Sequence, residues 1–105
     1  MLFLLRQLLE LFGVDARHTK GHWAKTELGR NVASYSPEAS CWCLQGGIYF
    51  VSEKFSLTKD DRMQAAAALD AQAEKLGFEN LVHFNDDPKT TPKQVRALIE
   101  SAINS

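Results

Sequence analysis

The sequence predicts a mainly α domain of the α+β class, with about four helices and a short β-hairpin between the first two. Apolar residues recur at helical spacing in both terminal segments. Side chains that cap helices stand before three of the predicted helices, and short runs of strand-forming residues follow the first helix. A chain of 105 residues with 45% hydrophobic content and a net charge of -1 is typical of one compact domain, residues 1–105.

The first element is predicted as an apolar helix over Met1–Phe12, ended by Gly13 (residues 1–13). Arg6, Gln7 and Glu10 fall on one narrow stripe of this helix, and leucines occupy the opposite side. These polar residues are unlike a secretory signal, and a membrane span needs roughly 20 apolar residues. We expect the helix to be buried, to mediate self-association into an oligomer, or to bind a protein partner.

A β-hairpin is predicted next. His22–Lys25 and Asn31–Ser34 read as two short strands joined by a turn at Leu28-Gly29-Arg30. Because a two-stranded hairpin is marginal alone, we expect it to pack on the helices.

The second helix is predicted to begin at Ser36, a natural N-cap that is followed by Pro37 at the first helical position. It would run to about Glu53. Gly46 and Gly47 would then lie inside the helix, where each costs about 1 kcal/mol relative to alanine. A close contact with another helix would offset this cost.

The same segment supports a second interpretation, in which Cys41–Leu44 and Ile48–Val51 are strands, because the latter run is rich in strand-forming residues. The capping pattern favours the helix. In that case Cys43 lies about two turns inside it.

The third helix has clear boundaries. Thr58 is its cap, Asp60 and Asp61 occupy its first turn, and Gly77 ends it. The small side chains of Ala65–Ala68 allow close approach, so we expect them to face the glycines of the second helix.

The fourth helix is predicted from a cap at Thr91, through Pro92, to about Ile103. One apolar stripe follows helical spacing and predicts the buried face. Its members are Val95, Leu98, Ile99, Ala102 and Ile103.

Several spaced residues resemble a family of small bacterial and phage domains of unknown function, over roughly residues 20–103. The shared pattern is a Trp-Cys-apolar-apolar-Gly-Ala helix, a Trp-Asn-Asp box and a final helix. The matching residues are Trp23, Gly29, Ser36–Ala39, Trp42–Leu44, Gly46, Phe84–Asp86, Pro88, Thr90 or Thr91, Val95, Leu98 and Ala102. This chain departs from it at Phe84, where the family more often has Trp, and at Gly47, where it more often has Ala. The resemblance favours the helix over the strands and implies a phage or mobile-element association, but no activity.

One catalytic hypothesis is a small cysteine-dependent hydrolase, with Cys43 as nucleophile, His83 as base and Asn85 or Asp86 orienting the histidine. The order of these residue types is that of papain-like enzymes. A position two turns inside a helix is too deep for strong activation of the thiol, however, and a cysteine between Trp42 and Leu44 is more often an inert core residue.

A zinc site is the second chemical hypothesis, because His18, His22, Cys41 and Cys43 include the residue types of tetrahedral sites. On a helix the two cysteines would point about 200° apart and would not share an ion, whereas on strands they would share a face, so the zinc hypothesis depends on the strand interpretation. We therefore expect neither a metal nor a cofactor.

The Asn85-Asp86-Asp87-Pro88 box is expected to form a turn that leads into the last helix and caps the end of the second or third helix. If it has a further role, it presents polar groups to a ligand or partner. Trp42, Asn85 and Asp86 are therefore the predicted binding residues.

Nucleic acid is not an expected partner, because Lys89, Lys93 and Arg96 form only a weak patch in a chain of balanced charge. Two cysteines do not form a disulfide framework, so we expect a reduced, cytoplasmic protein. The function predicted from these features is that of a non-catalytic interaction or accessory module.

Overall fold

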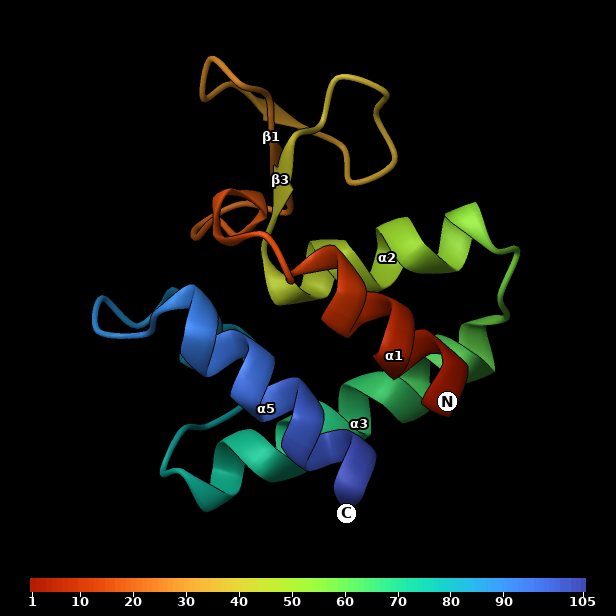
Figure 1. Cartoon of the computed structure of the whole chain (residues 1–105), viewed down its shortest axis with the longest axis vertical. Helices are drawn as coiled ribbons and strands as arrows, with labels where there is room; N and C mark the ends of the chain where they lie inside the picture. The colour runs from red at the N-terminus through yellow and green to blue at the C-terminus, as the bar shows by residue number, and fades with distance from the viewer.

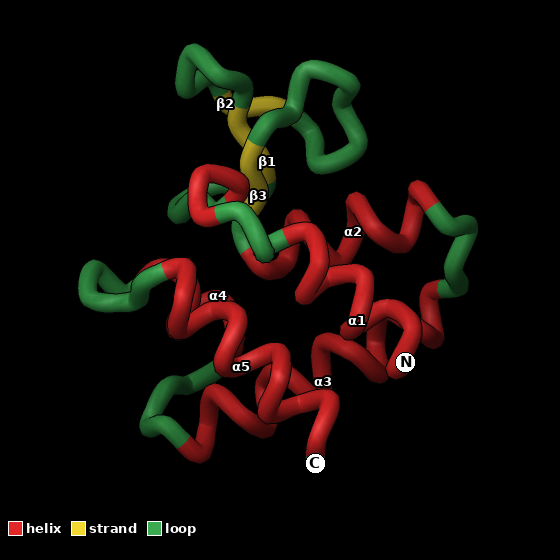
Figure 2. The backbone as a smooth tube through the Cα atoms, viewed as in Figure 1, coloured by secondary structure: helices red, strands yellow, loops and turns green.

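A computed structural model describes all residues, 1–105, and confirms the predicted fold class. It has five α-helices, a 3-10 turn and a three-stranded antiparallel sheet (Figures 1 and 2). The helices are α1 (Leu2–Leu11), α2 (Leu44–Lys54), α3 (Lys59–Lys75), α4 (Leu81–Asp86) and α5 (Pro92–Asn104). The remaining elements are η1 (Asp15–Arg17), β1 (Ala24–Lys25), β2 (Asn31–Val32) and β3 (Cys41–Trp42).

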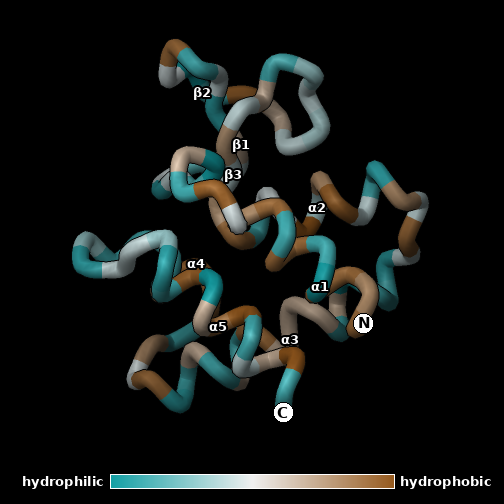
Figure 3. The backbone as a smooth tube through the Cα atoms, in the orientation of Figure 1, coloured by the Kyte–Doolittle hydropathy of each residue, from teal (hydrophilic) through white to brown (hydrophobic).

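Helix α1 lies at the centre of the helical part, where it packs on α2, α3 and α5 (Figure 1). Brown and teal segments alternate along it in Figure 3, as expected for a helix with one polar stripe. Its apolar face is buried through Leu4, Leu5, Leu8 and the following Phe12. Most of the apolar surface of this helix therefore belongs to the core of its own chain.

The small sheet lies at one end of the molecule, and both termini lie on the side away from it (Figure 1). Its strand order is β2-β1-β3, so the predicted hairpin is confirmed, with strands shorter than expected. Gly29 takes the left-handed conformation (φ 81°) in the turn between β1 and β2. Ala24 of β1 faces Val32 on one side and Trp42 on the other.

The predicted start of the second helix at Ser36 is wrong. Ser36 and Pro37 lie in a turn, where the Ser36 hydroxyl accepts a hydrogen bond from the Glu38 N–H at 3.2 Å. The following residues pair with β1 as strand β3, and the helix begins only after Cys43. Since β3 must lie beside β1, long-range pairing overrides the local capping pattern.

The sequence predicted that the two glycines of α2 face the alanines of α3, and this prediction is wrong. A Cβ atom on Gly46 would lie 1.8 Å from the backbone oxygen of Trp23, and one on Gly47 would lie 2.9 Å from side-chain atoms of Leu8 and Phe12. Gly46 therefore allows the first turn of α2 to touch the segment before β1. Gly47 allows α1 to approach.

Helices α3 and α5 begin where the sequence predicted. Thr58 and Thr91 each form a capping box, with Asp61 and Gln94 as the reciprocal partners. The short helix α4 was not expected, since its residues read as an apolar run and a turn. The Asn80 side chain caps it by accepting a hydrogen bond from the His83 N–H at 2.9 Å.

Candidate functional site

The side chain of Asn85 joins three segments that are distant in the sequence. Its Oδ1 accepts a hydrogen bond from the Leu44 N–H (3.1 Å) at the start of α2 and lies 2.7 Å from Nε2 of His18. Its Nδ2 donates to the backbone oxygen of Thr19 at 3.2 Å. Asn85 is only 1% exposed, so these bonds satisfy a buried amide.

Asp86 and Asp87 bond to Lys20 and Gly21, the two residues that follow Thr19. Asp86 Oδ1 accepts hydrogen bonds from the Gly21 N–H (3.0 Å) and from Asn85 Nδ2 (2.9 Å). The Lys20 ammonium donates to the backbone oxygen of Asp87 at 2.6 Å. The end of α4 therefore holds residues 18–21 against the start of α2. The box was expected to cap the end of the second or third helix, whereas Asn85 accepts from the first N–H of α2.

His18 is a neutral donor in this arrangement. The bond from the Leu44 N–H identifies this atom of Asn85 as the amide oxygen, which can only accept, so Nε2 of the ring carries the proton in their hydrogen bond. Burial lowers the pKa of His18 below its ordinary value of 6.5, and Lys20 lowers it further. The hydrogen bond to Asn85 and the charge of Asp86 oppose this shift.

Cys43 lies at the N-cap of α2 and not two turns inside it, which corrects the sequence prediction. Its Sγ accepts a hydrogen bond from the Gly46 N–H at 3.2 Å. Burial raises the pKa of the thiol above its ordinary value of 9.0, although the backbone hydrogen bonds at the helix start act in the opposite direction. The thiol is therefore protonated at neutral pH.

A cavity of about 380 Å³ lies beside the start of α2, and we call it the α2 cavity. Its polar lining consists of His22, Cys43, Gln45, Asn85 and Asp86. The rest of the lining is Gly21, Trp23, Tyr49 and Val82. The rings of Trp23 and Tyr49 stack with their centroids 4.9 Å apart, and Trp23 is 47% exposed.

The structure brings some of the predicted site residues together and separates others. Cys43, Asn85 and Asp86 line the α2 cavity, whereas His83 does not. His83 is exposed, and its Nδ1 lies 3.2 Å from the carboxylate of Glu79 in the loop before α4. Trp42 is buried against Phe50, and its indole N–H donates to the backbone oxygen of Ser34 at 2.8 Å.

The other candidate residues are spread over the fold. No three His, Cys, Asp or Glu side chains are grouped as a metal site requires. Arg96, from the basic patch, bonds to Asp15 (2.6 Å) and to the backbone oxygen of Phe12 (3.0 Å), so it links α5 to the end of α1. No helix has the combination of length and apolar character needed to cross a bilayer.

Trp23, Gln45 and Tyr49 line the cavity, but none of them was among the site residues predicted from the sequence. Gln45 and Tyr49 are four residues apart, which places them on one face of α2. The helix predicted from Ser36 to Glu53 already contained this spacing, but it did not show that this face borders a cavity. Trp23 comes from the predicted hairpin, and its stacking on Tyr49 is a long-range contact.

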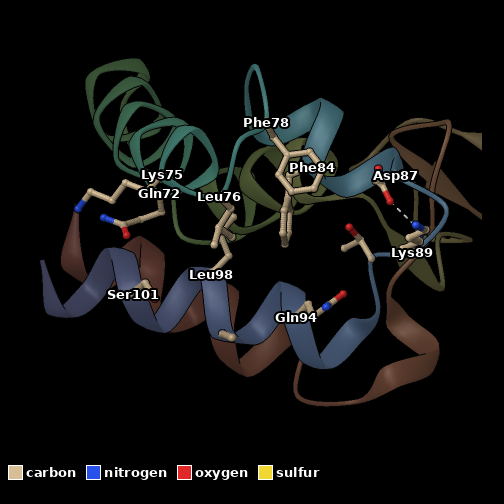
Figure 4. Close-up of a pocket in the computed structure, with 12 residues that line it drawn as sticks. Gln72, Lys75, Leu76, Phe78, Phe84, Asp87, Lys89, Gln94, Leu98 and Ser101 are labelled. Carbon is tan, nitrogen blue, oxygen red and sulfur yellow. Dashed lines mark hydrogen bonds between the residues drawn. The ribbon is translucent and has the colours of Figure 1, made fainter.

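A second hollow, the α3–α5 groove, has a volume of about 690 Å³ (Figure 4). Its apolar residues are Leu76, Phe78, Phe84, Ala97 and Leu98. Gln72 and Lys75 lie at one end, and Asp87 and Lys89 lie at the other (Figure 4). The groove is separate from the site residues that the sequence predicted.

The fold and the site define a small, mainly α domain in which the last two residues of the short helix α4, Asn85 and Asp86, line a polar cavity. A family model matches residues 3–105, and the chain belongs to DUF6197, a family of unknown function. The match includes α1, which lay outside the region of the resemblance seen in the sequence. No curated protein and no solved structure matches the chain significantly.

Proposed function

We propose that the protein is a non-catalytic interaction module and that the α2 cavity binds its protein partner. The observation that carries this proposal is the exposed Trp23, which stacks on Tyr49 at a cavity lined by polar side chains. Partly exposed aromatic residues beside convergent polar groups are typical of binding sites. Following the sequence and the resemblance, we place the module in the cytoplasm and associate it with phage or mobile elements.

The state of Cys43 supports binding over catalysis. A nucleophilic cysteine acts as its thiolate, and the raised pKa of Cys43 keeps the thiol protonated at neutral pH. The predicted base, His83, bonds to Glu79 outside the cavity. The hydrogen bonds of Asn85 explain its position without any catalytic role.

The test compares partner capture by three tagged proteins: the wild type, Trp23→Ala and Leu76→Ala. Leu76 is 62% exposed in the α3–α5 groove, so its truncation is a matched loss of apolar surface outside the α2 cavity. Circular dichroism verifies that each variant is folded. Captured proteins are identified by mass spectrometry, and direct binding is then measured with the purified partner.

We expect one partner to be captured by the wild type and by Leu76→Ala, and lost with Trp23→Ala. Gln45→Ala, at another residue that lines the cavity, should show the same loss. Capture that is equal in all variants, or that is lost only with Leu76→Ala, contradicts the proposal.

A cysteine-dependent hydrolase is the second candidate function, favoured by the position of Cys43 at a helix N-cap in a cavity that also contains His22 and Asp86. Its test is the rate of iodoacetamide labelling in Cys41→Ser, where Cys43 is the remaining thiol. The binding proposal predicts slow labelling at pH 7 that rises only above pH 9. Rapid labelling at pH 7, abolished by His83→Gln or His22→Gln, favours the hydrolase.

Self-association through α1 is a further part of the proposal, with a second copy of the chain as the occupant. Leu2 and Phe3 are exposed at the start of α1, and Phe3 contacts the exposed Phe55 ring edge-to-face at 5.1 Å. An apolar edge of this kind can pack on its symmetry mate. Sedimentation velocity should show a dimer that Phe3→Ser converts to a monomer, whereas a wild-type monomer at high concentration contradicts it.

A further inference from the structure

The polar side chains around the α2 cavity fall into two groups. The amide of Asn85 and one oxygen of Asp86 are held by internal hydrogen bonds. In contrast, the side chains of His22, Gln45 and Tyr49 line the cavity and make no hydrogen bond within the chain. The cavity therefore presents donors and acceptors that are free to bind a ligand.

Asp86 supplies the negative charge of this cavity. Its Oδ1 is held by the Gly21 N–H at 3.0 Å and by Asn85 Nδ2 at 2.9 Å, while Oδ2 has no partner within the chain. Asp86 takes part in no ion pair. It is thus a carboxylate that is fixed in position and has one free oxygen.

The neighbouring cations are already engaged. The Lys20 ammonium bonds to the backbone oxygen of Asp87 at 2.6 Å. The Arg62 guanidinium lies 5.2 Å from the centre of the Tyr49 ring and donates to the Ser52 hydroxyl at 3.0 Å. Neither group neutralises Asp86 by direct contact.

The ring of Trp23 provides a flat aromatic surface in the same cavity as the Asp86 carboxylate. Its ring lies at 24° to that of Tyr49, with a centroid separation of 4.9 Å, and almost half of the residue is exposed. Aromatic faces attract cations, and planar cations also stack on them. Arg62 shows that one ring of this pair already accepts a guanidinium.

We propose that the group bound by the α2 cavity is the guanidinium of an arginine side chain of the partner; this rests on the proposed function of the cavity. The planar group stacks on Trp23 and donates hydrogen bonds to Asp86 Oδ2 and to the Gln45 amide oxygen. A guanidinium has five donors in one plane, so it can serve both acceptors while it is stacked. A lysine ammonium provides the charge but no flat face.

The test is a titration with N-acetyl-arginine amide, followed through the indole N–H signals of the ¹⁵N-labelled protein. The two tryptophans provide an internal control, because Trp23 lies at the cavity whereas the indole N–H of Trp42 is bonded to Ser34 in the core. We expect the Trp23 signal to shift with a dissociation constant on the order of 1 mM, and the Trp42 signal to stay in place.

Two control compounds separate the effect of the positive charge from the effect of the planar shape of the guanidinium. N-acetyl-citrulline amide has nearly the same shape as the arginine probe but is neutral, and N-acetyl-lysine amide is charged but not planar. Both should bind at least about fivefold more weakly, because each lacks one of the two features. Equal binding of citrulline and arginine overturns the proposal.

Asp86→Asn should weaken arginine binding about tenfold, and the neighbouring Asp87→Asn should change it less than about twofold. Asp87 is the matched control, because it lines the α3–α5 groove and not the α2 cavity. If Asp86→Asn has no effect, or if the arginine probe leaves Trp23 unshifted, the arginine proposal is wrong. Loss of partner capture with Trp23→Ala would still support the proposed function in that event, so the two failures are distinguishable.

Discussion

At the scale of single residues, Asn85 determines how the candidate site is built. It is 1% exposed, and its side-chain amide serves the backbone N–H of Leu44 and the backbone oxygen of Thr19. An aspartate or leucine of similar size would not provide both a donor and an acceptor at this point. Asn85, which the sequence placed in a turn, is therefore a buried residue whose hydrogen bonds hold together the segments that line the cavity.

The substitution Asn85→Ala should destabilise the protein by about 2–4 kcal/mol. It leaves the Leu44 N–H and the Thr19 oxygen without partners, and each unsatisfied buried group costs roughly 1–3 kcal/mol. The free energy of unfolding in urea measures the effect. Asn104→Ala is the control, since Asn104 is exposed near the C-terminus and should change stability by less than about 0.5 kcal/mol.

His18 should make the stability depend on pH. Because its pKa is lower in the folded chain than its ordinary value of 6.5, the unfolded chain binds more protons between these two values. The contribution of neutral His18 to the free energy of unfolding is therefore complete above about pH 6.5. It is lost as the pH falls from 6.5 through the lower pKa of the folded chain. Urea unfolding between pH 5 and pH 8 measures it.

His18→Gln should flatten this dependence, because the glutamine amide can still donate to Asn85 but does not titrate. A wild type whose stability rises as the pH falls from 6.5 would show that the sign of the His18 effect is opposite to the one expected.

At the scale of elements, the starts of α3 and α5 could be predicted and the start of α2 could not. Thr58 and Thr91 form capping boxes with residues three positions later, so the information is local. Ser36 has an equally good local pattern, but the chain that follows it pairs with β1. The N-cap of α2 is instead supplied by Cys43, together with a hydrogen bond from Leu44 to the distant Asn85.

Gly46 is the position at which α2 meets the segment before β1. We expect Gly46→Ala to destabilise the protein by more than about 3 kcal/mol, because the added Cβ would lie 1.8 Å from the backbone oxygen of Trp23. Either α2 or the loop that ends in Trp23 must then move. Thermal unfolding measures the effect.

Gly47→Ala is the matched substitution one residue later. Its added Cβ would lie 2.9 Å from side-chain atoms of Leu8 and Phe12, which can shift, and helix propensity returns about 1 kcal/mol. We expect a smaller loss than for Gly46→Ala. The reverse order would mean that the close approach of α2 and Trp23 is not as described.

At the scale of the whole molecule, α1 is the helix on which α2, α3 and α5 all pack. The sequence predicted its amphipathic pattern but left open whether it was buried, self-associating or bound to a partner. The packing of α1 on α2, α3 and α5 depends on helices that follow much later in the chain. Its boundaries could therefore be predicted, whereas its partners within the fold could not. For the same reason, the contact of Trp23 with Tyr49 was not predictable.

Deletion of residues 1–12 should abolish cooperative folding. It removes Leu4, Leu5, Leu8 and Phe12, each at most 1% exposed, and truncating a single buried leucine already costs about 2–5 kcal/mol. Four such losses total about 8–20 kcal/mol, which is as large as the 5–15 kcal/mol by which a typical domain is stable. Circular dichroism on heating should show no sigmoidal transition for the deletion variant.

Leu2→Ser is the control for this deletion, because Leu2 is exposed at the start of the same helix. It should unfold cooperatively, within a few degrees of the wild type. A cooperative transition in the deletion variant would show that α1 is an accessory helix and not part of the core.

The most direct measurement is the dissociation constant of the purified partner, determined by calorimetry for the wild type, Trp23→Ala and Leu76→Ala. If the α2 cavity is the binding site, Trp23→Ala weakens binding at least about tenfold, a loss typical of an aromatic residue at the centre of an interface. Leu76→Ala then stays within about twofold of the wild type. Unchanged binding by Trp23→Ala, with the variant folded, would contradict the assignment of the cavity as the interaction site.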